Sequence, residues 1–92
     1  MSDQQNVAAQ GNKVNWDDSD MRSTYANVAN VGSTVEEMML LFGTSQNWNG
    51  SQDEIDVKLS DRIIMNPRAA KRLFLLLGSV IADYEKKNGE IK

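Results

Sequence analysis

Four basic residues lie within eleven positions of one another and are the best candidates for chemistry: Arg62, Arg68, Lys71 and Arg72. Only Asp61 offsets them locally. Cations at the start of a helix oppose its dipole, unless an anion lies against them. Arginine and lysine also bind phosphate and carboxylate groups. The cluster therefore predicts a site for an anion or an acidic partner surface. The alternative is that these charges only solvate the outer face of a helix.

Other chemistry has little support in the composition. The chain has no histidine and no cysteine, which removes the commonest acid–base group, thiolate ligands and disulfides. Several acids could be imagined as cation ligands, but they lack the spacing of a calcium loop: Glu36, Glu37, Asp53, Glu54 and Asp56. We therefore expect no catalytic residue, no cofactor and no metal, and a protein that is not an enzyme.

The size and charge of the chain favour self-association. Its 92 residues suit one small domain with a thin core. Residues 1–57 carry nine acids and two bases, whereas residues 58–92 carry eight bases and four acids. These halves can pair within one chain or between copies. The net charge of -3 makes broad nucleic-acid binding unfavourable. Without a signal peptide or a spanning apolar run, we expect a cytoplasmic protein that does not enter membranes.

The most regular segment predicts a helix from Asn66 to Asn88. Asn66 is a good N-cap, Pro67 suits the first helical position, and Asn88-Gly89 is a typical stop. Apolar residues follow at spacings of three and four and form one broad stripe: Ala70, Leu73, Phe74, Leu77, Val80, Ile81 and Tyr84. This stripe suits packing on a sheet.

Some small and apolar residues of this helix fall beside or opposite the stripe. Leu75 points nearly opposite to it, Leu76 extends its edge, and Gly78 would allow close backbone approach. We predict that a second copy contacts the helix here, with a candidate interface of Leu75, Leu76, Gly78 and Ser79. The alternative is one ordinary exposed leucine.

The N-terminal part predicts a tail and then a hairpin. Residues 1–21 are polar and acidic and predict a disordered tail. Its Trp16, beside several aspartates, is either a docking motif or a side chain resting loosely on the domain. Residues 22–92 then form a single domain. Alternation over residues 24–31 predicts a strand, and the turn is expected at Val31–Thr34.

The middle of the chain completes the predicted sheet. Val35–Phe42 is read as a strand, although Thr34 and Glu37 also match a helix capping box. A loop over residues 43–53 carries Trp48, which either recognises a partner or covers the sheet edge. Residues 54–66 alternate cleanly and predict a third strand, with a bulge near Ser60–Arg62.

Three blocks of the sequence resemble the family known as domain of unknown function 3467. They are Tyr25-Ala26-Asn27, the run from Arg62 to Leu73 (RIIMNPRAAKRL) and Tyr84-Glu85. The resemblance covers residues 22–91 and departs at Leu41, where the family usually has Asp. It implies a strand–strand–strand–helix domain without a known activity. It also implies, weakly, a transcription-associated role, and no binding residue can be transferred.

We therefore predict an α+β fold, in which a three-stranded antiparallel meander is followed by one long C-terminal helix packed on the sheet. The predicted function is a non-catalytic, homo-oligomeric protein-interaction module. The alternative is a transcription-associated accessory factor. It would bind an anionic protein partner or nucleic acid through the basic start of the helix.

Overall fold

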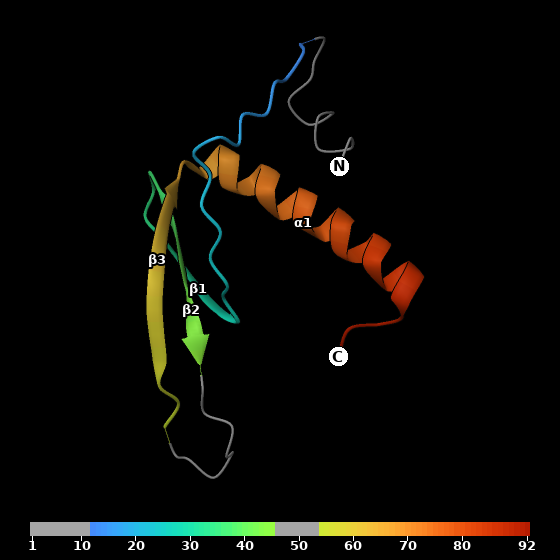
Figure 1. Cartoon of the computed structure of the whole chain (residues 1–92). Coiled ribbons are helices and arrows are strands. Elements are labelled where there is room, and N and C mark those ends of the chain that lie inside the picture. Colours follow the sequence, from blue (N-terminus) through green and yellow to red (C-terminus); the bar gives the residue numbers. More distant parts are fainter. Residues whose placement is uncertain (1–11, 46–53) are drawn as a thin grey trace. The chain divides into compact units, whose positions relative to one another are not determined.

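The computed structural model describes residues 12–45 and 54–92, and in them three strands precede one helix (Figure 1). The elements are β1 (Val28–Ser33), β2 (Met38–Ser45), β3 (Val57–Met65) and α1 (Pro67–Asn88). The strands form one antiparallel sheet in the order β1-β2-β3. The predicted α+β class, with a meander followed by a C-terminal helix, is confirmed.

The chain divides into two compact units, and each is described by itself. The sheet unit comprises Arg22–Pro67, and the helix unit comprises Arg68–Lys92 together with Met1–Met21. Packing of the helix on the sheet stays a prediction, as do the disordered tail and the single domain over residues 22–92. Residues 1–11 of that tail lie outside the described residues, as does Trp48 with the rest of 46–53.

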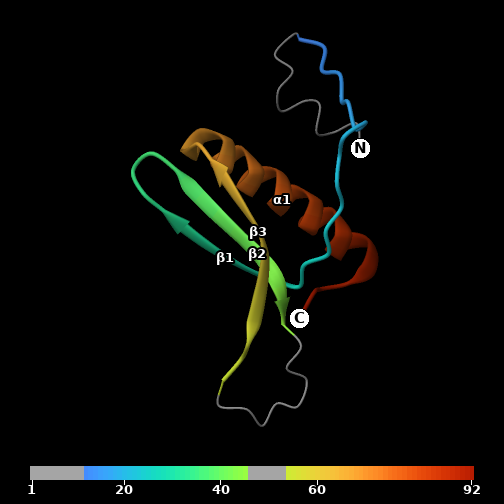
Figure 2. The same cartoon turned by 60° about the vertical axis from the view of Figure 1, so that its left-hand side comes forward.

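Figure 2 shows β1 and β2 joined by a short turn. This turn lies at Thr34–Glu37, three residues later than the sequence predicts. The turn expected at Val31–Thr34 is wrong, because β1 continues through Gly32 and Ser33, which pairs with Met38. The prediction of a first strand from residue 24 also starts too early, since β1 begins at Val28. The run of apolar residues in β2 supplies the backbone partners that extend β1 to Ser33.

The loop between these strands explains why Thr34 and Glu37 resemble a helix cap. The backbone N–H of Thr34 donates to the carbonyl of Glu37 at 2.9 Å. The Thr34 hydroxyl oxygen accepts the N–H groups of Glu36 and Glu37, each at 3.2 Å. A threonine side chain satisfies turn N–H groups as well as those of a helix start. The prediction that Val35–Phe42 forms a strand is confirmed from Met38 onward.

Asn27 extends the pairing of β1 with β2 beyond the strand end. Its backbone N–H donates to the carbonyl of Gly43 at 3.0 Å. Its side-chain Oδ1 accepts the N–H of Ser45 at 2.9 Å, and Nδ2 donates to the Ser45 carbonyl at 3.4 Å. The amide side chain thus replaces a peptide group opposite β2. The loop expected from Gly43 therefore begins too early, because β2 continues to Ser45.

β3 begins at Val57 rather than at residue 54, and it contains the predicted bulge. Phe42 pairs with Asp61 and Gly43 pairs with Leu59, so Ser60 has no partner in the register. The Ser60 hydroxyl donates to Asp61 Oδ1 at 2.7 Å and lies 3.3 Å from the Phe42 carbonyl. A bulge bends its strand and increases the local twist.

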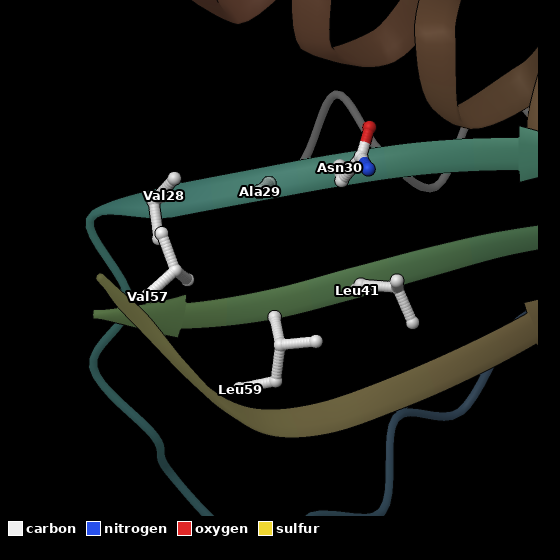
Figure 3. Close-up of a pocket in the computed structure, with 6 residues that line it drawn as sticks. All are labelled: Val28, Ala29, Asn30, Leu41, Val57 and Leu59. Carbon is white, nitrogen blue, oxygen red and sulfur yellow. The ribbon is translucent and has the colours of Figure 1, made fainter. Parts of the chain in front are cut away.

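Gly43 lies opposite this bulge and is the one buried residue in the described part of the chain. A Cβ atom there would lie 2.9 Å from the Leu59 Cα and would overlap the carbonyl oxygen of Lys58. Figure 3 shows β3 curving across the end of β2 in the part that carries Val57 and Leu59. Only glycine allows the two backbones to approach so closely.

Helix α1 has the bounds that its capping residues predict. It starts at Pro67, directly after Asn66, and it ends at Asn88. Gly89 follows with a φ of 91°, and its N–H donates to the Glu85 carbonyl at 2.9 Å. This left-handed residue is a common way to end a helix. The start and stop predicted from the sequence are confirmed.

Candidate functional site

Both faces of the sheet carry apolar side chains, because β2 is apolar at five successive positions. Successive residues of a strand point to opposite faces, and residues paired across strands share a face. The register places Val31, Met38, Leu40, Phe42, Ile63 and Met65 on what we call the first face. It places Val28, Met39, Leu41, Val57, Leu59 and Ile64 on the second face.

Neither face is buried. Two neighbouring residues of β3 illustrate this, since Ile63 on the first face is 49% exposed and Ile64 on the second is 51% exposed. The side chains of β2 are half-buried on both faces. The described residues contain no buried apolar side chain. The sheet therefore presents apolar surface in two opposite directions.

An open hollow of about 340 Å³ lies in the sheet unit (Figure 3). Its lining residues come from all three strands and are Val28, Ala29, Asn30, Leu41, Val57 and Leu59. Gly43 pairs with both Val28 and Leu59, so a residue without a side chain lies between two residues of the lining. Most of these residues belong to the second face. The size is at the low end of the range for ligand pockets, roughly 300–1,000 Å³.

One basic residue lies beside this hollow. Arg62 pairs with Leu41 across β2 and β3, so it shares the second face with that lining residue. Its side chain is exposed. The hollow therefore combines an apolar floor with a cation at its border.

The other three predicted anion-binding residues lie on α1. Arg68, Lys71 and Arg72 are exposed and have helical spacings of three and four, so they share one helix face. The first turn contains no acidic residue. Because Arg62 belongs to the sheet unit, only three of the four are brought together within one unit. Binding of an anion by the full set stays a prediction.

The predicted interface residues of α1 are all accessible. Leu75 is 58% exposed, Ser79 is exposed and Leu76 is half-buried. A Cβ added at Gly78 would meet no atom within 4 Å. Leu75, Gly78 and Ser79 share a face, whereas Leu76 lies at the edge of the apolar stripe. Their role in self-association stays a prediction.

Two side chains of the apolar stripe of α1 are largely exposed. Phe74 is 68% exposed, more than Leu75 on the polar side, and Leu77 is 53% exposed. No residue of the helix is buried. Exposure therefore does not single out Leu75, and packing of the stripe on the sheet stays a prediction.

A hydrogen-bonded turn follows Trp16, which is 66% exposed. The Asp17 carboxylate accepts the backbone N–H of Ser19 at 3.0 Å and its hydroxyl at 2.8 Å. These two hydrogen bonds, the backbone one first, lower the pKa of Asp17 below its usual value. The N–H of Met21 then donates to the Asp18 carbonyl at 3.1 Å. The aromatic ring thus precedes a hydrogen-bonded acidic turn.

The hollow was missed by sequence reasoning, although two signals could have indicated it. Gly43 ends an apolar strand segment, which suggests close backbone approach as readily as a loop. The predicted bulge lies opposite this glycine, and a bulge bends its strand locally. Neither signal identifies which side chains line the hollow, because the lining depends on the register of the three strands.

Metal chemistry and membrane insertion have no structural support in the residues that were described. No group of three or more acidic, histidine or cysteine side chains among residues 12–45 and 54–92 is arranged to hold a metal ion. Over the same residues, no helix has both the length and the apolar character needed to cross a bilayer.

These features define a small α+β protein whose sheet is apolar on both faces. The chain belongs to the family described as Protein of unknown function (DUF3467), whose model matches residues 1–92. The resemblance seen in the sequence is therefore confirmed. No curated protein and no solved structure is significantly similar to the chain.

Proposed function

We propose that this protein is a non-catalytic interaction module that acts as a homo-oligomer. The observation that carries the proposal is the sheet with apolar side chains on both faces. A sheet must cover its apolar faces with other elements to be stable. The described chain has one helix, and one helix covers at most one face of a sheet. A second apolar face is therefore left for another molecule.

The area of one sheet face is consistent with a contact between proteins. Three strands about 4.8 Å apart, with about eight residues at ~3.3 Å each, make a face of roughly 14 × 26 Å. This is close to half of the ~800 Å² that each partner of a stable complex buries. Contacts of the helix unit with the second copy, such as those predicted at Leu75 and Ser79, can supply the remainder.

A second copy is the partner best supported by charge. The acidic residues are concentrated in positions 1–57 and the basic ones in positions 58–92. Two copies arranged head to tail bring these opposite charges together. A chain of this size has a thin core of its own, and association is one way to add stability.

The test is light scattering after gel filtration, over protein concentrations from about 1 to 100 μM. The wild-type chain is expected at a multiple of 10.3 kDa. Ile63→Lys and Ile64→Lys form a matched pair, because they change neighbouring residues of similar exposure on opposite faces. One of them should shift the mass toward the monomer while circular dichroism retains the folded spectrum.

A third variant, Leu75→Asp, tests the predicted interface on the helix. It should also lower the mass if the second copy contacts that side of α1. A wild-type chain that remains at 10.3 kDa at 100 μM would refute the proposal. Equal, unchanged masses for all three variants would place the contact elsewhere in the chain.

A second candidate function is binding of an anionic surface by α1, as an accessory factor in transcription. It is favoured by the three exposed basic residues of its first turns, which no acid in the first turn neutralises. Lys71→Glu combined with Arg72→Glu should abolish salt-sensitive capture of partners from the native host. Unchanged capture by a folded double variant would exclude this function.

A further inference from the structure

We propose that the hollow on the second face receives Trp16 of a second copy, with the acidic turn after Trp16 directed at Arg62. The inference rests on the proposed function, because it requires that copies associate. It names the contact that joins them. Three observations support it: the size of the hollow, the exposure of Trp16 and the charges around both.

The size of the hollow suits one large side chain. Its volume of about 340 Å³ is at the low end of the range for ligand pockets, and the hollow is open to solvent. Aromatic residues bury about 150–250 Å² each and commonly anchor protein contacts in such apolar depressions. The floor is formed by branched aliphatic side chains, namely Val28, Leu41, Val57 and Leu59. These side chains provide an apolar contact surface for an indole ring.

Trp16 has the properties of an anchor. It is 66% exposed, so its indole ring is accessible to a partner. The turn at Asp17–Ser19 fixes the chain directly after it through two side-chain hydrogen bonds. A residue held in this way loses less conformational entropy when it binds. In addition, the indole N–H needs an acceptor. Asn30 Oδ1 in the lining already accepts the Val31 N–H at 2.9 Å and has a second lone pair for the indole.

The charges at the two surfaces are complementary. Asp17, Asp18 and Asp20 follow Trp16, and all are exposed. Arg62 lies next to the lining residue Leu41 on the second face. An indole placed over Leu41 therefore brings a carboxylate within reach of a guanidinium. Such pairs orient a complex and accelerate its formation.

The first experiment measures the dissociation constant of the full-length oligomer by sedimentation. Trp16→Ala should weaken it by roughly 30-fold or more, the loss typical of a central aromatic anchor. Leu59→Gln should weaken it comparably. Ile63→Gln is the matched control on the first face, with similar exposure, and should change the constant less than threefold. Arg62→Glu should weaken association and reduce its dependence on salt.

The second experiment follows the fluorescence of Trp16 itself. Trp48→Phe leaves Trp16 as the only tryptophan, since the chain has two. Its emission should move to shorter wavelength as the protein concentration rises. A variant that keeps Trp16 but carries Leu59→Gln in its hollow is then mixed with a second variant. The second variant lacks both tryptophans and keeps the hollow intact. Only docking between copies shifts the emission upon mixing.

The outcomes separate this inference from the proposed function. If the wild-type chain associates but Trp16→Ala associates equally well, the inference is wrong and the proposed function stands. If Trp16 emission is already at short wavelength and unaffected by dilution or mixing, the segment rests on its own chain, and the inference is again wrong. A chain that is monomeric throughout overturns both.

Discussion

Replacing Gly43 by alanine tests whether the close approach of β2 and β3 shapes the sheet. The added Cβ would lie 2.9 Å from the Leu59 Cα and from the Lys58 carbonyl carbon, and nearer still to the Lys58 oxygen. All three atoms belong to the backbone, so no change of rotamer relieves the overlap. The strands must separate instead.

The size of this effect follows from the distances. Carbon atoms in favourable contact lie about 3.5–4.0 Å apart, so β3 must retreat by at least ~0.6 Å. A shift of this size stretches the neighbouring ladder hydrogen bonds, each of which contributes about 0.5–1.5 kcal/mol. Alanine recovers about 0.4–1 kcal/mol by restricting the unfolded chain. We expect a net loss of about 2 kcal/mol in the free energy of unfolding, within the range for overpacking.

The assay is urea unfolding followed by circular dichroism, at one fixed protein concentration because association stabilises the folded chain. With a slope of about 1–2 kcal/mol per molar urea, the midpoint should fall by ~1–2 M. Gly32→Ala is the matched control in β1, since a Cβ there meets no atom within 4 Å. If Gly43→Ala is as stable as Gly32→Ala, the reasoning about backbone approach is refuted.

Three further predictions concern single side chains. Asn27→Ala should lower the unfolding free energy by about 1–2 kcal/mol, because two hydrogen bonds to Ser45 are lost. Asn27→Asp keeps the acceptor and should lose less stability. Equal losses in the two variants would argue against a stabilising role of these hydrogen bonds. Gly78→Ala should raise helix stability by about 1 kcal/mol, and a weaker oligomer in the same variant would indicate close approach of another backbone there. The Asp17 carboxyl should titrate below the ordinary ~3.9 in an NMR pH series, so its turn forms at higher pH and is lost as the pH falls through that lowered value. Ser19→Ala should return this pKa toward the ordinary value, and an unchanged titration would exclude the hydrogen bonds as the cause.

Local signals in the sequence predicted the elements well. The helix has the start at Asn66-Pro67 and the stop at Asn88-Gly89 that its capping residues indicate, because caps act within a few residues. The bulge near Ser60 was also predictable, since the apolar pattern of the strand changes phase there. In contrast, Gly32-Ser33 and Gly43 were read as turn signals. The pairing with a neighbouring strand outweighed the local preference in both places.

The surfaces were less predictable than the elements. The sequence shows that Met38–Phe42 is apolar throughout, but this pattern alone does not separate a buried strand from one with two exposed faces. The hollow depends on which residues of three separate strands meet, and that is set by the register. Asn27 is another example, because its role comes from Ser45, eighteen positions away. Such long-range pairs leave no periodic trace in one sequence.

The bulge at Ser60 has a consequence for how this chain can vary. Without Ser60, the pairs of Phe42 with Asp61 and of Gly43 with Leu59 would follow each other in a regular ladder. The same side chains would keep their faces, but β3 would straighten and its backbone would withdraw from Gly43. Position 43 could then carry a larger residue. Ser60 and Gly43 therefore depend on each other. We expect a deletion of Ser60 to restore the stability that is lost when Gly43 is substituted.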